Sequence, residues 1–413
     1  MALIVQKFGG TSVGSIERIK NVATKVKKEI DLGNQVVVVV SAMSGETNRL
    51  VSLCEDSSDL VSDESLREYD VVVSSGEQVT SGLLAMALQS DGIPARSMLS
   101  WQAEIITDEN FSKARVEGIN GDKIINAVNA GQVVVIPGFQ GVFEDEFGEK
   151  RLATLGRGGS DTSAVAVAAA INADRCDIYT DVDGVYTTDP RLVPKARKLN
   201  KVGYEEILEM ASLGAKVLHT RSVELAMKHN VKVQVRSSFD DTEGTYLVEE
   251  EEVMERRLIT GVTYSRSDAQ VTIKNVKNTP GIAADVFGPL SDAEINVDMI
   301  VQNVSKEQDV ADITFTVPKT DIAKAEQVLG DSKLEFESLY KATNVAKVSV
   351  IGVGMRSHAG VAQKMFQTLA DKGINILVIS TSEIKISVLI DEEYLELALR
   401  SLHTAYNLDA DAA

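Results

Sequence analysis

Up to about Asn230, short apolar runs rich in β-branched residues alternate with longer amphipathic segments. An apolar run opens the chain at Leu3, and a helical pattern extends from about Ser15 to Ile30. Further runs with strand character are Val36–Ser41, Val133–Pro137, Asp177–Thr180 and Val231–Arg236, and segments with helical character include Glu77–Gln89, Ala164–Ala173 and Tyr204–Met210. This alternation predicts an α/β fold, with a mainly parallel sheet that helices cover on both faces.

The part after about Gly261 contains an internal repeat. At a constant offset of 79 residues (360 minus 281), Gly281, Ile282, Ala283, Phe287, Leu290, Asp292, Ile295 and Asn296 recur as Gly360, Val361, Ala362, Phe366, Leu369, Asp371, Ile374 and Asn375. Each copy shows a β-α-β-β-α order, one strand short of a ferredoxin-like βαββαβ unit. We expect Leu334–Tyr340 to complete the first sheet and Leu258–Tyr264 to be borrowed by the second.

Composition narrows the class of protein. The chain has 413 residues, 44% of them hydrophobic and 25% charged, which is typical of a globular protein with two or three domains. A net charge of −19 without basic clusters argues against binding to nucleic acid or to a membrane surface.

Cysteine usage and the N-terminus indicate the compartment. The two cysteines, Cys54 and Cys176, form no CxxC motif, and the N-terminus shows no signal-peptide pattern. The longest apolar runs, such as Val36–Val40, are too short to span a bilayer. We therefore expect a cytoplasmic protein.

The four histidines show no metal-ligand spacing, so the sequence predicts no metal site built from them.

A glycine-rich turn, Leu155–Ser163, separates a strand-like run from the Ala-rich helix. Its glycines let backbone N–H groups approach a ligand, and the helix N-terminus favours an anion. Arg157 adds a two-pronged donor suited to a carboxylate or a phosphate. Ser160 and Asp161 also suit an ordinary helix cap, so a simple turn is the alternative interpretation.

Lys7 lies at the end of the first strand, beside Gly9 and Gly10, where a cation is well placed to hold a phosphate. The spacing matches neither the P-loop nor GxGxxG, which argues against a nicotinamide dehydrogenase. Lys7, Ser41 and Asp181 all follow or end strand-like runs. Because ligands in such sheets bind at the carboxyl ends of strands, we expect these three to share one edge.

A series of motifs follows along the chain: Lys7–Ser12, Val40–Met43, Ser75–Glu77, Gly138–Gly141, Leu155–Asp161, Tyr179–Tyr186 and Lys216–Leu218. In this order, and with the features above, they closely resemble the aspartate kinases of the amino acid kinase family. The resemblance covers essentially the whole chain, and its C-terminal part is similar to a tandem pair of amino-acid-sensing ACT domains. No homoserine dehydrogenase extension follows Ala413, which favours the monofunctional form.

The resemblance implies transfer of the γ-phosphoryl group of ATP to the side-chain carboxylate of L-aspartate. The product would be 4-phospho-L-aspartate, on the route to lysine, methionine, threonine and diaminopimelate. A carboxylate is already ionised at neutral pH, so no general base is needed, and catalysis would come from positioning and electrostatics. We expect Mg²⁺ to be carried on the nucleotide phosphates, with no protein ligand assigned.

The same resemblance assigns site residues. Catalysis falls to Lys7 and Lys216, which Asp161 orients. Aspartate would be bound by Ser41, Thr47, Glu77, Arg157, Gly158, Gly159 and Ser160. ATP would be bound by Lys7, Phe8, Gly9, Gly10, Thr180, Asp181, Tyr186, Asp189, Arg191 and Lys216. From the residues alone, a first-turn helix acid is the preferred interpretation of Glu77, and Tyr186 is equally a core residue.

The resemblance also implies regulation and domain limits. Lysine and threonine together would inhibit, and the chain would form a homo-oligomer through its ACT domains. Effector contacts fall at Asn296, Val297, Asp298 and Gln302 in the first copy and at Asn375, Ile376, Thr381 and Ser382 in the second. The predicted domains are 1–245 (kinase), 246–263 (linker and borrowed strand), 264–343 and 344–413 (ACT), with an internal start near Met254 left open.

Two alternatives remain at this point. The first is another amino acid kinase, acting on glutamate, carbamate or a nucleoside monophosphate. The second is a non-catalytic regulator that binds amino acids. The tandem repeat argues against the first. The presence of Lys7, Asp161 and Lys216 together argues against the second.

Overall fold

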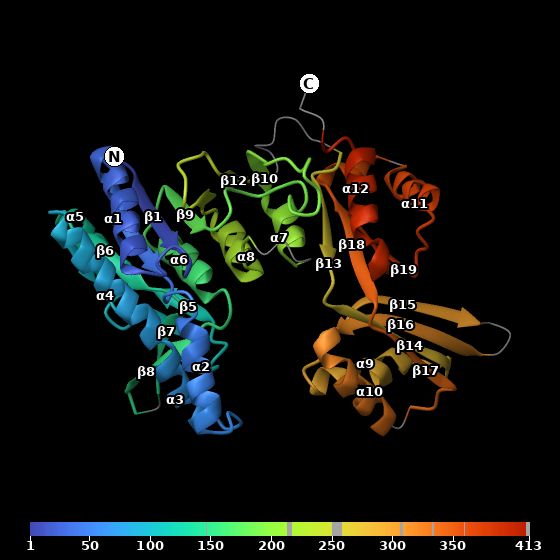
Figure 1. Ribbon diagram of the computed structural model, residues 1–413. Helices are drawn as coiled ribbons and strands as arrows, with labels where there is room; N and C mark the ends of the chain where they lie inside the picture. The colour runs from blue at the N-terminus through green and yellow to red at the C-terminus, as the bar shows by residue number, and fades with distance from the viewer. Residues whose placement is uncertain are drawn as a thin grey trace. The chain divides into compact units, whose positions relative to one another are not determined.

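A computed structural model describes residues 1–145, 147–212, 217–249, 258–305, 309–332, 334–358 and 360–409. The chain forms two compact units (Figure 1). Unit 1 comprises Met1–Val185, Lys198–Ser212 and Lys216–Met254, and unit 2 comprises Tyr186–Arg197, Leu213–Ala215 and Glu255–Ala413. The segment Tyr186–Arg197 therefore belongs to unit 2, although the chain on both sides of it belongs to unit 1.

Unit 1 is built on an eight-stranded sheet with the strand order β10-β12-β11-β9-β1-β2-β6-β3. All neighbouring strands run parallel except β11 and β12, which confirms the predicted mainly parallel sheet. The strands are β1 (Leu3–Phe8), β2 (Gln35–Val40), β3 (Ala95–Ser97), β6 (Val133–Pro137), β9 (Arg175–Thr180), β10 (Lys201–Gly203), β11 (Val233–Ser237) and β12 (Thr245–Val248). Their valine-rich cores are buried on both faces, as expected for a covered parallel sheet.

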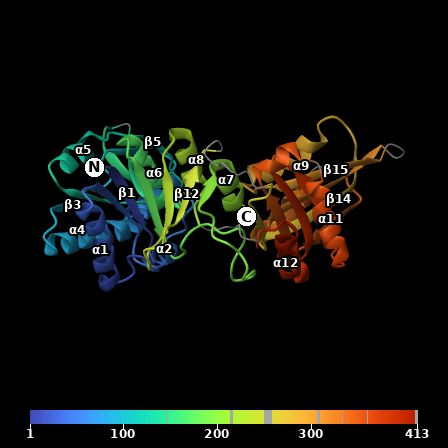
Figure 2. The same cartoon turned by 90° about the horizontal axis from the view of Figure 1, so that it is seen from above.

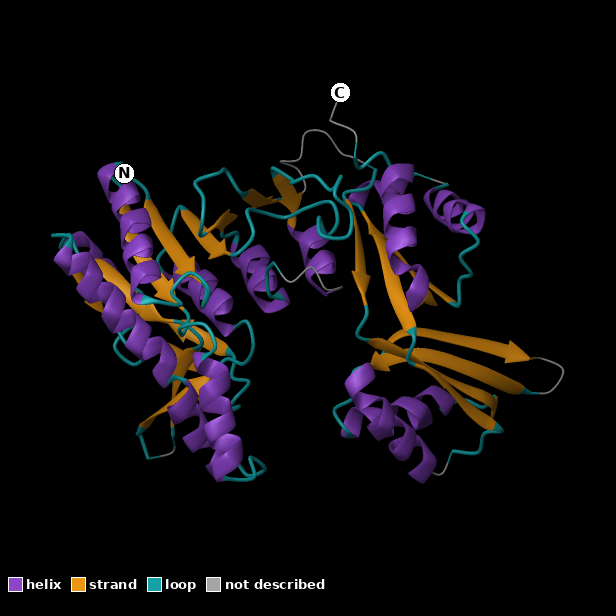
Figure 3. Cartoon of the chain, in the orientation of Figure 1, coloured by secondary structure: helices purple, strands orange, loops and turns teal. Residues whose placement is uncertain are grey.

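Helices cover both faces of this sheet (Figures 2 and 3). On one face, α1 and α4 pack on Phe8 and on alternate residues of β2 and β6. On the other face, α6 packs against β1, β2 and β9, and α8 packs on α6. The helices are α1 (Ile16–Asp31), α2 (Glu46–Ser57), α3 (Asp63–Val73), α4 (Ser75–Ser90), α5 (Asp122–Asn129), α6 (Gly159–Ala170), α7 (Tyr204–Ser212) and α8 (Thr220–His229).

A second, four-stranded sheet in unit 1 was not among the predicted elements. Its order is β5-β4-β7-β8, with β4 (Ile105–Thr107), β5 (Val116–Ile119), β7 (Gln140–Glu144) and β8 (Lys150–Thr154). These strands are short and partly exposed, so they show little apolar periodicity. Strand β8 leads directly into the glycine-rich turn and so places it.

Unit 2 contains the two copies of the repeat as two four-stranded sheets, ordered β15-β16-β14-β17 and β13-β18-β20-β19. Strand β17 completes the first sheet against β14, and β13 is borrowed from the preceding chain to pair with β18, as predicted. The strands are β13 (Gly261–Ser265), β14 (Asp268–Lys277), β15 (Asp298–Ser305), β16 (Val310–Pro318), β17 (Ser338–Ala342), β18 (Val345–Ile351), β19 (Val378–Thr381) and β20 (Lys385–Asp391). The helices are α9 (Ile282–Asp292), α10 (Ile322–Asp331), α11 (Val361–Asp371) and α12 (Leu395–Ala405).

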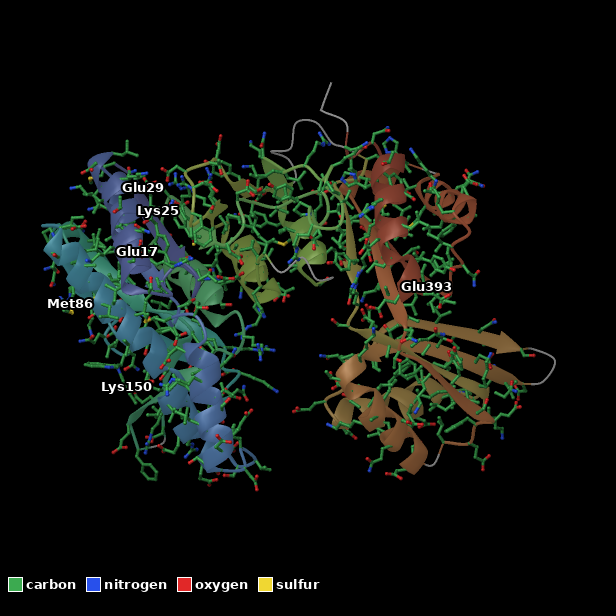
Figure 4. All side chains as sticks on the ribbon, in the orientation of Figure 1. Glu17, Lys25, Glu29, Met86, Lys150 and Glu393 are labelled. Atoms are coloured by element: carbon green, nitrogen blue, oxygen red, sulfur yellow. The ribbon has the colours of Figure 1, made fainter. Side chains whose placement is uncertain are left out.

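One helical stretch, Asp63–Ser90, is long and apolar enough to cross a membrane by length and composition alone. It combines α3 and α4. The sequence patterns predicted a helix over Glu77–Gln89 but did not indicate one continuous stretch of this length. Half of its most apolar window is buried inside the fold, where Leu84 and Leu88 pack with α1. Met86 lies on the exposed side of α4 (Figure 4). The burial is that of a core helix.

Candidate active site

An ion pair joins the first strand to the helix that follows the glycine-rich turn. Lys7 Nζ on β1 lies 2.6 Å from Asp161 Oδ1 in the first turn of α6, and both side chains are nearly buried. Phe8 points to the α1 and α4 face, so the alternation of a strand directs Lys7 to the opposite face, where α6 packs. The predicted Lys7 and Asp161 are thus brought together.

The carboxyl ends of three neighbouring strands meet beside this pair. Phe8 is in register with Val40 on β2 and with Tyr179 on β9. Just beyond the strands, the N–H of Ser41 donates to the carbonyl of Phe8, and the N–H of Gly9 donates to that of Tyr179. Lys7, Ser41 and Asp181 therefore share one edge, as expected.

Glycines allow the chain to pass closely at this edge. A Cβ atom on Gly10 would lie 3.0 Å from the carbonyl of Ala42, and one on Gly9 would lie 3.4 Å from Lys7 Nζ. Gly138 donates to the carbonyl of Val40, and a Cβ there would lie 2.9 Å from that of Ser160. Ser160 is consequently placed near the end of β2.

The glycine-rich turn needs its glycines. Gly156 and Gly158 have φ values of 75° and 73°, in the left-handed region. A Cβ on Gly158 would come within 2.2 Å of the His219 ring, and one on Gly159 within 2.8 Å of Leu155 Cβ. Arg157 is exposed and, among the described residues, has no ion-pair partner. The turn therefore presents a free guanidinium at the N-terminus of α6.

Glu77 is a buried acid in the first turn of α4, only 3% exposed. Its neighbour Gly76 lets the helix approach, since a Cβ there would lie 2.8 Å from Ala42 Cβ. Burial raises the pKa of Glu77 to about 7, although the N–H of Ala42 donates to its carboxylate. One carboxylate oxygen lacks a hydrogen-bond partner among the described residues. Such an acid suits a cationic ligand better than a mere helix cap.

The remaining predicted substrate residues lie at the same edge. Thr47 is half-buried on α2, which begins after Gly45, and Ser160 is 9% exposed. Thr47 and Ser160 lie with Ser41 and Glu77 around the end of β2. The arrangement offers a cation for phosphate, a guanidinium for a carboxylate and a buried carboxylate for an ammonium.

The predicted nucleotide residues divide between the units. Thr180 ends β9 and Asp181 follows it, and the Thr180 hydroxyl donates to the Asp181 carboxylate at 3.1 Å. Tyr186, Asp189 and Arg191 belong to unit 2. There the Arg191 guanidinium lowers the pKa of Asp189, which also accepts the Tyr264 hydroxyl at 3.0 Å. Lys216 and Met254 lie outside the described residues. The described chain contains no group of three His, Cys, Asp or Glu side chains that could hold a metal ion.

The predicted effector residues line the edges of the two repeat sheets. Asn296, Gln302, Asn375, Thr381 and Ser382 are exposed, whereas Val297 and Ile376 pack partly against the cores. Asp298 is engaged by Lys347, whose Nζ lies 2.8 Å from its carboxylate. Burial raises the pKa of Asp298, but the Lys347 ammonium outweighs it, so the pKa lies below the usual value. The buried Lys347 was not among the predicted site residues.

Sequence patterns also missed Asp70 and Arg221, which hold the chain beside the glycine-rich turn. Asp70 accepts the N–H groups of Ser112 and Thr154, and Arg221 donates to the carbonyls of Leu155 and Ala114. Both residues lie in charged stretches of helix that show no motif. Only the fold brings them to the turn.

Comparisons with known proteins agree with this geometry. Residues 2–237 match the amino acid kinase family, and residues 271–332 and 348–406 match the ACT domain. The chain is 55% identical to an aspartate kinase of Pseudomonas putida, over 100% of this chain and 99% of the relative.

Solved structures show the same likeness. E. coli aspartokinase III in complex with aspartate and ADP is 25% identical, with a TM-score of 0.78 over 98% of this chain and 99% of that one. The same E. coli enzyme in complex with lysine and aspartate is 26% identical, with a TM-score of 0.75 over 97% and 99%.

Proposed function

Because the chain belongs to the amino acid kinase family and, within it, to the aspartate kinases, we propose that the edge around Lys7 transfers the γ-phosphoryl group of ATP to the side-chain carboxylate of aspartate. The product is 4-phospho-L-aspartate, an acyl phosphate that feeds lysine, threonine, methionine and diaminopimelate synthesis. The observation that carries this assignment is the Lys7–Asp161 ion pair at the carboxyl end of β1.

On the phosphoryl side, the Lys7 ammonium stabilises the charge on the transferring group. Asp161 fixes the direction of that ammonium. The N–H of Gly10 assists, whereas that of Gly9 already donates to the carbonyl of Tyr179. The attacking carboxylate is ionised at neutral pH, so no residue has to remove a proton. The barrier is mostly repulsion between anions, which positioned cations lower.

On the aspartate side, Glu77 holds the α-ammonium and Arg157 grips the α-carboxylate in a bidentate contact, with Ser41, Thr47 and Ser160 nearby. The unsatisfied oxygen of Glu77 and the free guanidinium of Arg157 support these roles. The backbone N–H of Gly158 completes this end of the site, whereas that of Gly159 donates to the carbonyl of Gly156 within the turn.

The nucleotide is held in unit 1 by Phe8, by Thr180 at the end of β9 and by Asp181 just after it. The assignments of Tyr186, Asp189, Arg191 and Lys216 rest on the resemblance alone. Since Asp161 is neutralised by Lys7, we assign no protein ligand to Mg²⁺. Bound to the phosphates, Mg²⁺ would neutralise charge on the β- and γ-oxygens.

The tandem ACT domains provide feedback inhibition by end-product amino acids, through lysine and threonine acting together. The proposed effector-binding residues lie on or beside the sheet-edge strands β15 and β19. They are Asn296, Asp298 and Gln302 in the first repeat and Asn375, Thr381 and Ser382 in the second. Apolar residues are exposed on β15, among them Ile300 and Val304, and on β19, namely Ile379. These edges suit association of chains through their ACT domains.

Trapping of the product with hydroxylamine tests the proposal. An acyl phosphate yields a hydroxamate, so the enzyme with ATP and Mg²⁺ should form aspartyl hydroxamate from L-aspartate. L-Glutamate and carbamate, and a nucleoside monophosphate in a coupled ADP assay, serve as alternative acceptors. Equal or faster turnover of any alternative would contradict the assignment.

A further inference from the structure

Two charged side chains hold the chain where β8 ends and the glycine-rich turn begins. The Asp70 carboxylate on α3 accepts the N–H of Thr154 at 2.9 Å and its hydroxyl at 2.5 Å. The Arg221 guanidinium on α8 donates to the carbonyl of Leu155 at 2.6 Å. The same two groups bind a neighbouring loop, Asp70 at the N–H of Ser112 and Arg221 at the carbonyl of Ala114.

The position of Arg221 is electrostatically unfavourable for α8. The residue lies in the first turn of that helix, where the aligned peptide dipoles place positive partial charge and favour acids. Its hydrogen-bond partners on Leu155 and Ala114 are neutral carbonyls. Burial lowers the pKa of Arg221, as expected for a desolvated cation. The stability of α8 by itself does not account for an arginine at this position. Its contacts with Leu155 and Ala114 do.

Asp70 is equally committed to the loop. It is completely buried, and its hydrogen bonds lead to Ser112 and Thr154. Burial raises the pKa of Asp70 to about 6, against the effect of these bonds. Its carboxylate supplies the acceptors that these buried backbone N–H groups require.

The turn begins at these two anchors, which fix its first peptide from outside. Gly156 and Gly158 have positive φ, and glycine at such positions leaves many backbone conformations open. The peptide that follows Leu155 sets the direction in which Arg157 leaves the fold. Its carbonyl is bound by Arg221, and the N–H of Leu155 donates to Phe139 at 2.8 Å.

We propose that Arg221 is a positioning residue. It fixes the Leu155 peptide, while Asp70 fixes the adjacent Thr154, and it thereby aims Arg157 at the carboxylate of aspartate. The inference rests on the proposed role of Arg157 in binding aspartate. Arg221 does not touch the substrate. It sets the affinity for aspartate, whereas the phosphoryl side at Lys7 is left unchanged.

The test is steady-state kinetics of Arg221→Lys. Lysine keeps the charge but cannot bind two carbonyls with one fork. The KM for aspartate should rise about 10-fold to 100-fold, because a small displacement of a substrate-gripping group is costly. The KM for ATP and kcat should change by less than about threefold. Arg221→Gln, which removes the charge, should raise the aspartate KM further in the same direction.

Arg175→Lys is the matched control. Arg175 also makes a partly buried fork, to Asp177 and Glu29, but at the amino end of β9, away from the strand ends of the site. This substitution should lower thermal stability and leave both KM values within about twofold. If it raised the aspartate KM as much as Arg221→Lys does, general destabilisation would explain both, and the proposal would fail.

Arg157→Ala, alone and combined with Arg221→Lys, separates this inference from the proposed function. If Arg157→Ala leaves the aspartate KM unchanged, the assigned role of Arg157 is wrong. If Arg157→Ala raises it but Arg221→Lys does not, only the inference is wrong. If both raise it, Arg221→Lys should add less than about twofold in the Arg157→Ala background, because it acts through Arg157. Full additivity would overturn the proposal.

Discussion

Lys7 on β1 and Asp161 on α6, 154 residues apart in the chain (161 minus 7), meet at 2.6 Å with both side chains nearly buried. A lysine inside a parallel sheet is costly unless a partner neutralises it. This pair lies at the carboxyl end of the strand, next to Gly9, where a ligand has access to the ammonium. This placement supports the proposal that Asp161 holds Lys7 ready for an anionic group.

Glu77 gives the reaction a pH dependence. Burial raises its pKa to about 7, so the free enzyme protonates it as the pH falls below that value, and the protonated form cannot pair with the ammonium of aspartate. The kcat/KM for aspartate should fall about fivefold from pH 7 to pH 6, measured at saturating ATP. Glu77→Gln should lower kcat/KM and flatten this limb. A wild-type slope in the variant would exclude Glu77 as the titrating group.

The same residue affects stability with a definite sign. An acid whose pKa is higher in the folded state than in the unfolded state stabilises the fold at low pH, and that contribution is lost as the pH rises from about 4.5 to about 7. Relative to wild type, Glu77→Gln should therefore gain stability over this window, by at most about 3 kcal/mol. Urea unfolding at several pH values measures the gain.

Glu17→Gln is the control for this measurement. Glu17 is also a first-turn acid, on α1, but it is exposed (Figure 4). Its substitution should leave the stability profile parallel to that of wild type. A parallel profile for Glu77→Gln as well would show that the Glu77 carboxyl does not titrate in this window.

Regulation can be tested at Ser382. Ser382 is exposed beyond β19, where its N–H closes a turn with Lys385. A phenylalanine there should block the effector site and remove inhibition by lysine plus threonine, which requires a coupling of about 1–3 kcal/mol. The uninhibited kcat should stay within about threefold. Inhibition curves with each amino acid alone and with both measure the effect.

Gln367→Phe serves as the control for this substitution. Gln367 is exposed on α11 of the same repeat, on a different element from the proposed effector residues, so inhibition should persist. Unchanged inhibition in Ser382→Phe would refute the site. Full inhibition of wild type by lysine alone would refute the concerted mode.

Periodicity was sufficient to predict the main sheet and both repeats. The strands have continuous apolar runs, and the helices have a clear 3.6-residue pattern, so the borrowed strand β13 could be anticipated from a copy that was one strand short. The second sheet of unit 1 was missed because its strands are short and half exposed. The inclusion of Tyr186–Arg197 in unit 2 depends on packing of Leu192 and Val193 into the second repeat's core, a long-range contact without a local signal.

The site divides in the same way. Lys7 and Arg157 stand beside glycines, which mark them in the sequence, and strand ends predict a shared edge. Asp70, Arg221 and Lys347 carry no such mark, because their partners are backbone groups or acids on distant elements. Whether Glu77 was a helix cap or a ligand could be judged only from its burial and its free oxygen.

The most direct test of the account is the turnover of Lys7→Ala in the hydroxamate assay, with circular dichroism to confirm the fold. Removal of the ammonium that stabilises the transferring phosphoryl group should lower kcat about 10²-fold to 10³-fold, roughly 3–4 kcal/mol. Lys25 lies on α1 (Figure 4), and Lys25→Ala, which removes its ion pair with Asp241, should keep wild-type turnover. A folded Lys7→Ala enzyme that retains more than about a tenth of kcat would contradict the assignment of Lys7 as the phosphoryl-stabilising group.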